Sequence, residues 1–177
     1  FCRKQDILLI VDEVQTGNGR TGKLYAYEHY GITPDIVTTA KGLAGGLPLG
    51  ACLFFEKTEH VFSAGDHGST FGGNPVCCAA AINVISRLTD DFLLEVQGKS
   101  EYLRAKVRLF DGVKSVTGFG LMIGLETEKS AKEIVSGCLQ KGLLLLTAHD
   151  RVRLLPPLTI TKKEMDEGLS VLKEVLK

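Results

Sequence analysis

Residues 36–50 read IVTTAKGLAGGLPLG, and the fold is best understood outward from this stretch. Its β-branched start predicts a strand, and a single lysine, Lys41, follows two residues later. No other charged residue lies between residues 36 and 55, and glycines crowd the positions after Lys41. Glycine lets backbone approach a bulky ligand closely. Poor hydration favours a neutral, nucleophilic lysine amine, so Lys41 is a candidate for covalent catalysis. A solvated lysine at a loop mouth is the alternative.

A second strand is predicted at residues 7–11, which read ILLIV without interruption. Such a run is typical of a strand in a parallel sheet that is covered on both faces. It ends in Asp12 and Glu13, and ligands of α/β sheets bind beyond the carboxyl ends of strands. Asp12 could cap the next loop, or it could pair with the protonated ring nitrogen of pyridoxal phosphate. Gln15 could then donate to the ring's phenolic oxygen, and Val14 could pack on the ring unless it is a core residue.

A polar, glycine-containing loop, DHGSTFGGNP, spans residues 66–75. Asn74 is a good N-cap and Pro75 suits the first helical position, so a helix is predicted from there to about residue 88. The hydroxyls of Ser69 and Thr70 lie close before this helix and could bind an anion such as phosphate, although an ordinary turn is the alternative. Pyridoxal phosphate requires an amine, a carboxylate for its ring nitrogen and a binding site for its phosphate, and the sequence offers a candidate for each of them.

The remainder of the chain alternates short strands and helices. Helices are predicted at residues 92–109 and 131–141, and a last helix begins with a capping box of Thr161 and Glu164. Strands are predicted at residues 113–117, 121–126, 143–147 and 152–155. We expect two α/β parts: residues 1–88 as the C-terminal part of a large domain, and residues 89–177 as a small α+β domain.

Two arginines, Arg151 and Arg153, lie next to and in the last predicted strand. Residues 151–155 read RVRLL, and alternation places Arg151 and Arg153 on the same strand face. A solvated face is the ordinary explanation, which we favour for Arg151. Arg153 lies closer to the rigid Pro156-Pro157 corner, which restricts where its guanidinium can reach.

Residues 17–23, GNGRTGK, match the spacing of an ATPase phosphate loop. Leu24 occupies the position of the hydroxyl residue that would bind magnesium, and the acidic strand precedes the loop instead of following it. A P-loop-like ATPase is therefore only a lesser alternative.

Composition restricts the class of protein. Lys plus Arg and Asp plus Glu both number 21, so the formal charge of zero suggests neither nucleic acid nor an anionic membrane as a partner. The five cysteines are odd in number and form no C-x-x-C pair, which favours a reducing cytoplasm and no metal site. Because the chain begins on Phe1 and enters a strand almost at once, we expect it to be part of a longer protein and inactive alone.

Three segments carry a family resemblance: VDEVQTGNGRTGKLYAYEHYGITPDIVTTAKGLAGGLPLGA (residues 11–51), HGSTFGGNP (67–75) and RLLPPLTIT (153–161). The sequence resembles the class III, ornithine-type aminotransferases, which are fold type I pyridoxal 5'-phosphate enzymes. The resemblance implies that Lys41 is catalytic and binds the cofactor covalently. It implies that Thr70 holds the cofactor phosphate across a homodimer interface, that Ser69 lies near the substrate and that Arg153 binds a substrate carboxylate. The residues it places along the cofactor are Asp12, Glu13, Val14 and Gln15.

The same resemblance implies a reaction. The terminal amine of N-acetylornithine would pass to 2-oxoglutarate, in arginine biosynthesis, at active sites shared between two subunits. Ornithine, 4-aminobutyrate or succinyldiaminopimelate are alternative donors, and a non-catalytic pyridoxal-phosphate-binding fragment is an alternative of another class. By its residues alone, Glu13 is better explained as a loop cap or a salt-bridge residue, and Arg20 has no assignable role.

Overall fold

The computed structural model describes residues 1–177, which form two compact units. The first unit contains residues 1–19 and 23–93, and the second contains residues 20–22 and 94–177. Helix α2 (Asp90–Val107) carries residues of both units. The division between the two units after residue 93 thus falls a few residues beyond the domain boundary predicted at residue 88. The assignment of the two units as domains stays a prediction.

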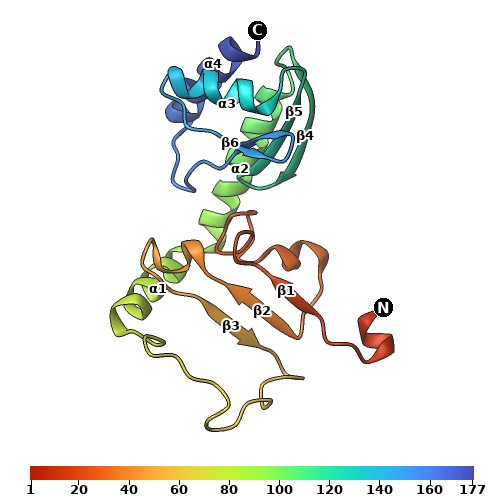
Figure 1. Ribbon diagram of the computed structural model, residues 1–177, viewed down its shortest axis with the longest axis vertical. Coiled ribbons are helices and arrows are strands. Elements are labelled where there is room, and N and C mark those ends of the chain that lie inside the picture. The colour runs from red at the N-terminus through yellow and green to blue at the C-terminus, as the bar shows by residue number, and fades with distance from the viewer. The chain divides into compact units, whose positions relative to one another are not determined.

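The first unit is built on a three-stranded sheet in the order β1-β2-β3 (Figure 1). The strands β1 and β2 are parallel, and Asp12 is in register with Thr38. The strands β2 and β3 are antiparallel, so the sheet is mixed. Its elements are η1 (Cys2–Gln5), β1 (Ile10–Asp12), η2 (Ala26–Tyr30), β2 (Ile36–Thr39), η3 (Lys41–Ala44), β3 (Ala51–Phe54) and α1 (Pro75–Arg87).

The core of this unit lies where η3 meets α1. Leu43 and Ala44 of η3 are buried with Ala81 of α1. The predicted start of α1 is confirmed, because the side chain of Asn74 accepts hydrogen bonds from two backbone N–H groups of the first helical turn, at 3.0 and 3.2 Å. Small side chains on α1 allow this close packing, which supports the backbone directly after Lys41.

The expectation that the first strand is covered on both faces is wrong for this chain. The strand is shorter and begins later than predicted, and the Ile10 side chain in it is 59% exposed. Ile7 and Leu8, just before it, are also exposed. Because β1 is an edge strand of the sheet, an apolar sequence alone cannot bury it; burial requires neighbouring elements.

The second unit contains an antiparallel sheet in the order β4-β5-β7-β6, with helices packed on it (Figure 1). Helix α3 contacts β6, β7 and α4, and a Cβ at Gly137 would lie 2.8 Å from Val175 Cγ1, so the two helices pack closely. Ile123, Leu125 and Val152 are buried in the core. Besides α2, its elements are β4 (Val113–Phe119), β5 (Met122–Thr127), α3 (Ala131–Gln140), β6 (Leu146–Ala148), β7 (Arg151–Leu154) and α4 (Lys162–Leu176).

Local sequence signals account for most of these boundaries. The capping box at α4 is confirmed, since Glu164 N donates to Thr161 Oγ1 at 3.3 Å and Thr161 N donates to the Glu164 carboxylate at 2.7 Å. Strand β6 differs from its prediction because it begins at Leu146 instead of residue 143. None of the helices is long and apolar enough to cross a membrane.

Candidate active site

Lys41 lies at the junction between β2 and η3. It is the first residue of η3, and its φ of +49° lies in the left-handed region, which non-glycine residues rarely occupy. Such backbone conformations cluster at functional sites, so this one supports a functional interpretation of Lys41. The expected poor hydration is not found in this chain, because the Lys41 side chain is exposed. The neighbouring glycines have no side chains with which to cover it.

Asp12 is the last residue of β1. Because β1 and β2 are parallel, it lies at the same end of the sheet as the last residues of β2. Its Oδ1 accepts two hydrogen bonds, from Val14 N at 2.9 Å and from Thr38 Oγ1 at 3.1 Å. Both bonds are made by Oδ1, so the carboxylate is oriented while it stays exposed. The parallel register places this acid and the end of β2 that leads to Lys41 at one end of the β1/β2 pair.

Glu13 has a different environment from its neighbour Asp12. It is completely buried, and its carboxylate accepts hydrogen bonds from the Thr16 hydroxyl and, at 2.8 Å, from Tyr27 N. A buried carboxylate requires such partners. The contacts agree with Glu13 as a loop cap that joins the turn after β1 to η2. Gln15 in this turn is exposed, whereas Val14 is half-buried.

Asn18 is a residue of the site that sequence reasoning missed. Its side chain is buried, and Nδ2 donates to Thr39 Oγ1 at 3.0 Å and to Ala40 O at 3.1 Å. It therefore holds the backbone immediately before Lys41. Its Oδ1 is buried without a hydrogen-bond partner. The only signal in the sequence was an Asn between two glycines. In the structure its φ is +54°, a conformation that Asn tolerates better than most residues.

Ser69 and Thr70 lie in the exposed loop before α1. Gly72 N donates to Ser69 O at 3.4 Å, and a Cβ at Gly72 would lie 2.8 Å from Ser69 Cβ, so the loop turns tightly at this point. The structure leaves both hydroxyls accessible. Their roles toward phosphate and substrate stay predictions.

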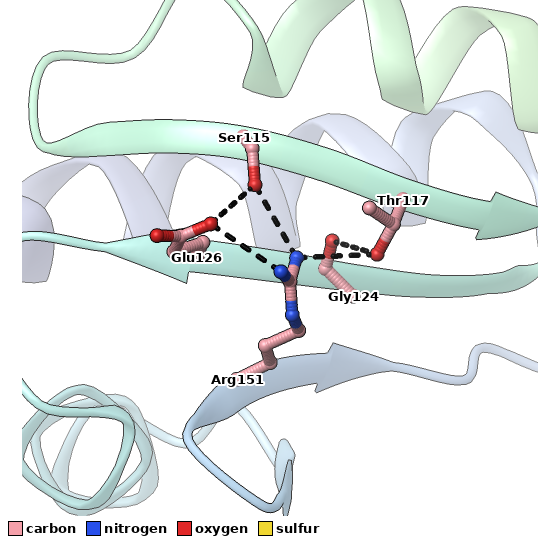
Figure 2. Close-up of polar contacts among 5 residues, drawn as sticks. All are labelled: Ser115, Thr117, Gly124, Glu126 and Arg151. Atoms are coloured by element: carbon pink, nitrogen blue, oxygen red, sulfur yellow. Dashed lines mark hydrogen bonds and ion pairs between the residues drawn. The ribbon is translucent and has the colours of Figure 1, made fainter.

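The two arginines of β7 share one face of the strand but differ in their partners. Figure 2 shows that Arg151 reaches across β5 to β4, where it donates to Ser115 Oγ and Thr117 Oγ1, both at 3.3 Å. It also forms an ion pair with Glu126 at 3.3 Å. Arg153 forms no ion pair, and its Nη2 is buried without a hydrogen-bond partner. Of these two guanidiniums, only that of Arg153 lacks an acidic partner, and its role toward a substrate carboxylate stays a prediction.

The phosphate-loop resemblance of residues 17–23 fails in the structure. A phosphate loop leads into a helix whose N-terminus faces the phosphates. Here the loop leads into the short 3-10 helix η2, and most of the loop residues are buried. It therefore offers no open cradle of N–H groups at a helix start, and the ATPase alternative loses its support.

Comparison with known proteins identifies the family of this chain. The family model for aminotransferase class III matches residues 1–176. The chain belongs to the class-III aminotransferases. It is 51% identical over 178 residues to an acetylornithine aminotransferase of Haemophilus ducreyi, covering 99% of this chain and 45% of that protein. It is 49% identical over 183 residues to that of Caldanaerobacter subterraneus, covering 99% and 46%. The chain thus spans under half the length of these curated relatives.

Solved structures show the same relationship. The N-acetylornithine aminotransferase of Stenotrophomonas maltophilia superposes with a TM-score of 0.86 at 35% identity, covering 98% of this chain and 48% of that one. An ornithine aminotransferase of Toxoplasma gondii, which carries pyridoxal phosphate at partial occupancy in its active site, has a TM-score of 0.90 at 32% identity over 99% of this chain and 44% of that one. The expected α/β fold, fold type I, is confirmed by these similarities.

The class-III residues present here fit a pyridoxal phosphate cofactor. An exposed carboxylate that is already oriented, Asp12, suits a protonated ring nitrogen. An exposed amine at the same sheet edge, Lys41, suits covalent attachment. Next to the backbone that leads to Lys41, the side-chain oxygen of Asn18 is buried and has no hydrogen-bond partner.

Proposed function

We propose that the full-length protein, this chain together with the remaining length of its relatives, is an aminotransferase for N-acetylornithine. It moves the terminal amine to 2-oxoglutarate with pyridoxal phosphate, as a step of arginine biosynthesis. The identity of about 50% to acetylornithine aminotransferases along nearly the whole chain supports this donor. The observation that carries the chemistry is the meeting of Lys41 and Asp12 at the carboxyl end of the parallel β1/β2 pair.

Each residue has a physical task in this proposal. When bound, the cofactor supplies an electron sink for the electron pair released at the carbon that bears the amine. The Asp12 carboxylate, oriented through Oδ1, keeps a proton on the ring nitrogen. Lys41 Nζ would hold the cofactor covalently until the substrate amine displaces it, and the freed amine would then move a proton from the substrate carbon to the cofactor carbon. Gln15 and Val14 line the ring, while Glu13 shapes the turn that carries them.

The substrate ends are recognised by other groups. Arg153 binds the α-carboxylate of glutamate or 2-oxoglutarate through two parallel hydrogen bonds, which its planar fork permits. Thr70 holds the cofactor phosphate of a partner subunit, and Ser69 lies near the donor. The exposed loop that carries these hydroxyls supports an intersubunit role, so we propose a homodimer with shared active sites. The odd number of cysteines without a C-x-x-C pair supports a cytoplasmic location.

The test combines a spectrum with a choice of donors. The full-length protein is incubated with pyridoxal phosphate, and a visible absorption band that survives gel filtration indicates covalent attachment. N-Acetylornithine should then bleach the band and 2-oxoglutarate should restore it, with glutamate as the product. Ornithine, 4-aminobutyrate and succinyldiaminopimelate, given at equal concentration, should react more slowly.

The outcomes separate the alternatives. Faster reaction with another of these donors would keep the chemistry but change the substrate. A stable band without turnover would indicate a non-catalytic pyridoxal-phosphate-binding protein. ATP hydrolysis in the absence of a band would reject the proposal.

A further inference from the structure

Residues Arg20 to Gly22 lie between elements of the first unit in the sequence but belong to the second unit. Leu121 N donates to Arg20 O at 3.0 Å, and the side-chain amide of Gln97 donates to Gly22 O at 2.7 Å. The three-residue segment is therefore held at both of its ends within the second unit.

A glycine at the β4–β5 turn makes this attachment possible. Gly120 has a φ of +52°, and a Cβ there would lie 2.4 Å from Thr21 C and 2.5 Å from Arg20 O. Because these atoms are backbone, rotation of a side chain could not relieve the contact. Residues 20–22 can therefore approach the turn this closely only because residue 120 is a glycine.

The Arg20 side chain extends the attachment to strand β7. Its Nη1 donates to Leu121 O at 3.2 Å and to Pro156 O at 2.6 Å. Leu121 immediately precedes β5, and Pro156 follows β7 by one intervening residue. Arg153 of β7 is in register with Gly124 of β5. Arg20 thus connects the start of β5 to the segment after β7, which is the strand that carries Arg153.

The environment of the Arg20 guanidinium includes the charge of Arg153. Burial, and then the neighbouring charge of Arg153, lower the pKa of the Arg20 guanidinium from its ordinary value. Neither arginine forms an ion pair, and Arg153 Nη2 is buried without a partner. Two adjacent cations without an acidic partner are relieved by a bound anion. The pair therefore favours a carboxylate on Arg153 more than a single arginine would.

We propose that Arg20 is a positioning residue that holds Arg153 for the carboxylate of glutamate or 2-oxoglutarate. Arg20 uses its hydrogen bonds on backbone carbonyls and acts on the substrate through the strand ends and its charge, without touching it. The inference rests on the proposed function, since the role of Arg153 is part of that function.

The test replaces Arg20 in the full-length protein. Arg20→Gln removes the charge and at least one of the two hydrogen bonds, so KM for 2-oxoglutarate should rise about tenfold while kcat changes by less than about threefold. The half-reaction with N-acetylornithine, followed by bleaching of the cofactor band, should stay within about twofold. Arg20→Lys keeps a charge and a donor, so its KM should rise about threefold. The dissociation constant of glutarate, an unreactive dicarboxylate, should follow KM in both variants.

A matched control and a double variant separate positioning from general damage. Arg104 Nη1 donates to Gly118 O at 2.7 Å, at the other end of the β4–β5 turn, so Arg104→Gln is the same substitution on the same kind of bond. It should leave glutarate binding unchanged. If Arg20 acts through Arg153, the loss of glutarate affinity in Arg20→Gln combined with Arg153→Lys should be smaller than the sum of the losses in the two single variants.

The proposal is overturned by additive losses in the double variant, by equal damage to both half-reactions, or by unchanged glutarate binding in Arg20→Gln. If that variant does not fold, an unchanged KM in folded Arg20→Lys overturns it as well. Glutarate binding needs no turnover, so it decides on Arg20 even if the unsubstituted protein transaminates none of the donors, which would defeat the proposed function instead.

Discussion

Arg153 on strand β7 offers the sharpest test of substrate recognition, because a second arginine on the same strand face provides an internal control. In the full-length protein, Arg153→Lys keeps the positive charge but replaces a planar fork with a single ammonium. Arg151→Lys makes the same chemical change two residues away. The two substitutions therefore differ only in what each guanidinium contacts.

The expected magnitude follows from these contacts. Arg153 Nη2 is buried without a protein partner, so a substrate carboxylate would be the acceptor of its hydrogen bond. A lysine at this position would make only one of the two parallel charged hydrogen bonds that arginine makes to a carboxylate. A bond of that kind contributes about 2–3 kcal/mol, which corresponds to roughly 30- to 150-fold in affinity. The Arg151 side chain is already paired with Glu126 and is 32% exposed. An exposed ion pair contributes about 0–1 kcal/mol, and lysine can retain it.

The assay measures both half-reactions under single-turnover conditions. Arg153→Lys should weaken apparent binding of 2-oxoglutarate and of glutamate by the factor given above, whereas Arg151→Lys should change neither by more than about twofold. Circular dichroism and the cofactor band confirm that both variants are folded and loaded. If the two variants behaved alike, or if Arg151→Lys were the damaging one, carboxylate recognition by Arg153 would be refuted.

Four further predictions concern the first unit and the chain as a whole. Borohydride reduction of the loaded full-length protein should trap the cofactor on Lys41, and mass spectrometry that located it on another lysine would contradict the assignment. Asp12→Asn should keep the fold but lose most of the turnover, because the ring nitrogen would no longer stay protonated; an unimpaired variant would leave Asp12 as a loop cap only. Glu13→Gln should lower the free energy of unfolding by about 1–3 kcal/mol, since the bonds from Thr16 and Tyr27 are accepted by different carboxylate oxygens and the amide NH2 that replaces one of them cannot accept; an unshifted urea midpoint would argue against this role. The 177 residues alone should neither transaminate nor retain the cofactor on gel filtration, because β1 exposes Ile10 at a free sheet edge, and measured turnover by this chain alone would refute that expectation.

Sequence alone determined the features that depend on neighbours within one turn. The start of α1 at Asn74 and the capping box of α4 follow from side chains that bond to backbone two or three residues away. An apolar run that ends in an acid also predicted a strand with a carboxylate at its C-terminal end, and β1 does end at Asp12. Equally short signals placed Lys41 just after a strand and the two arginines on one face of β7, whereas the roles of these residues stay predictions.

Tertiary structure decided how each of these side chains is surrounded. Asp12 and Glu13 are adjacent in sequence, yet one is exposed and the other is completely buried, because η2 and the turn after β1 close over only one of them. Asn18 and Arg20 gained their contacts from residues about 20 and more than 100 positions away. Periodicity and capping report only on near neighbours, so burial and long-range hydrogen bonds become visible only once the chain has brought distant segments together.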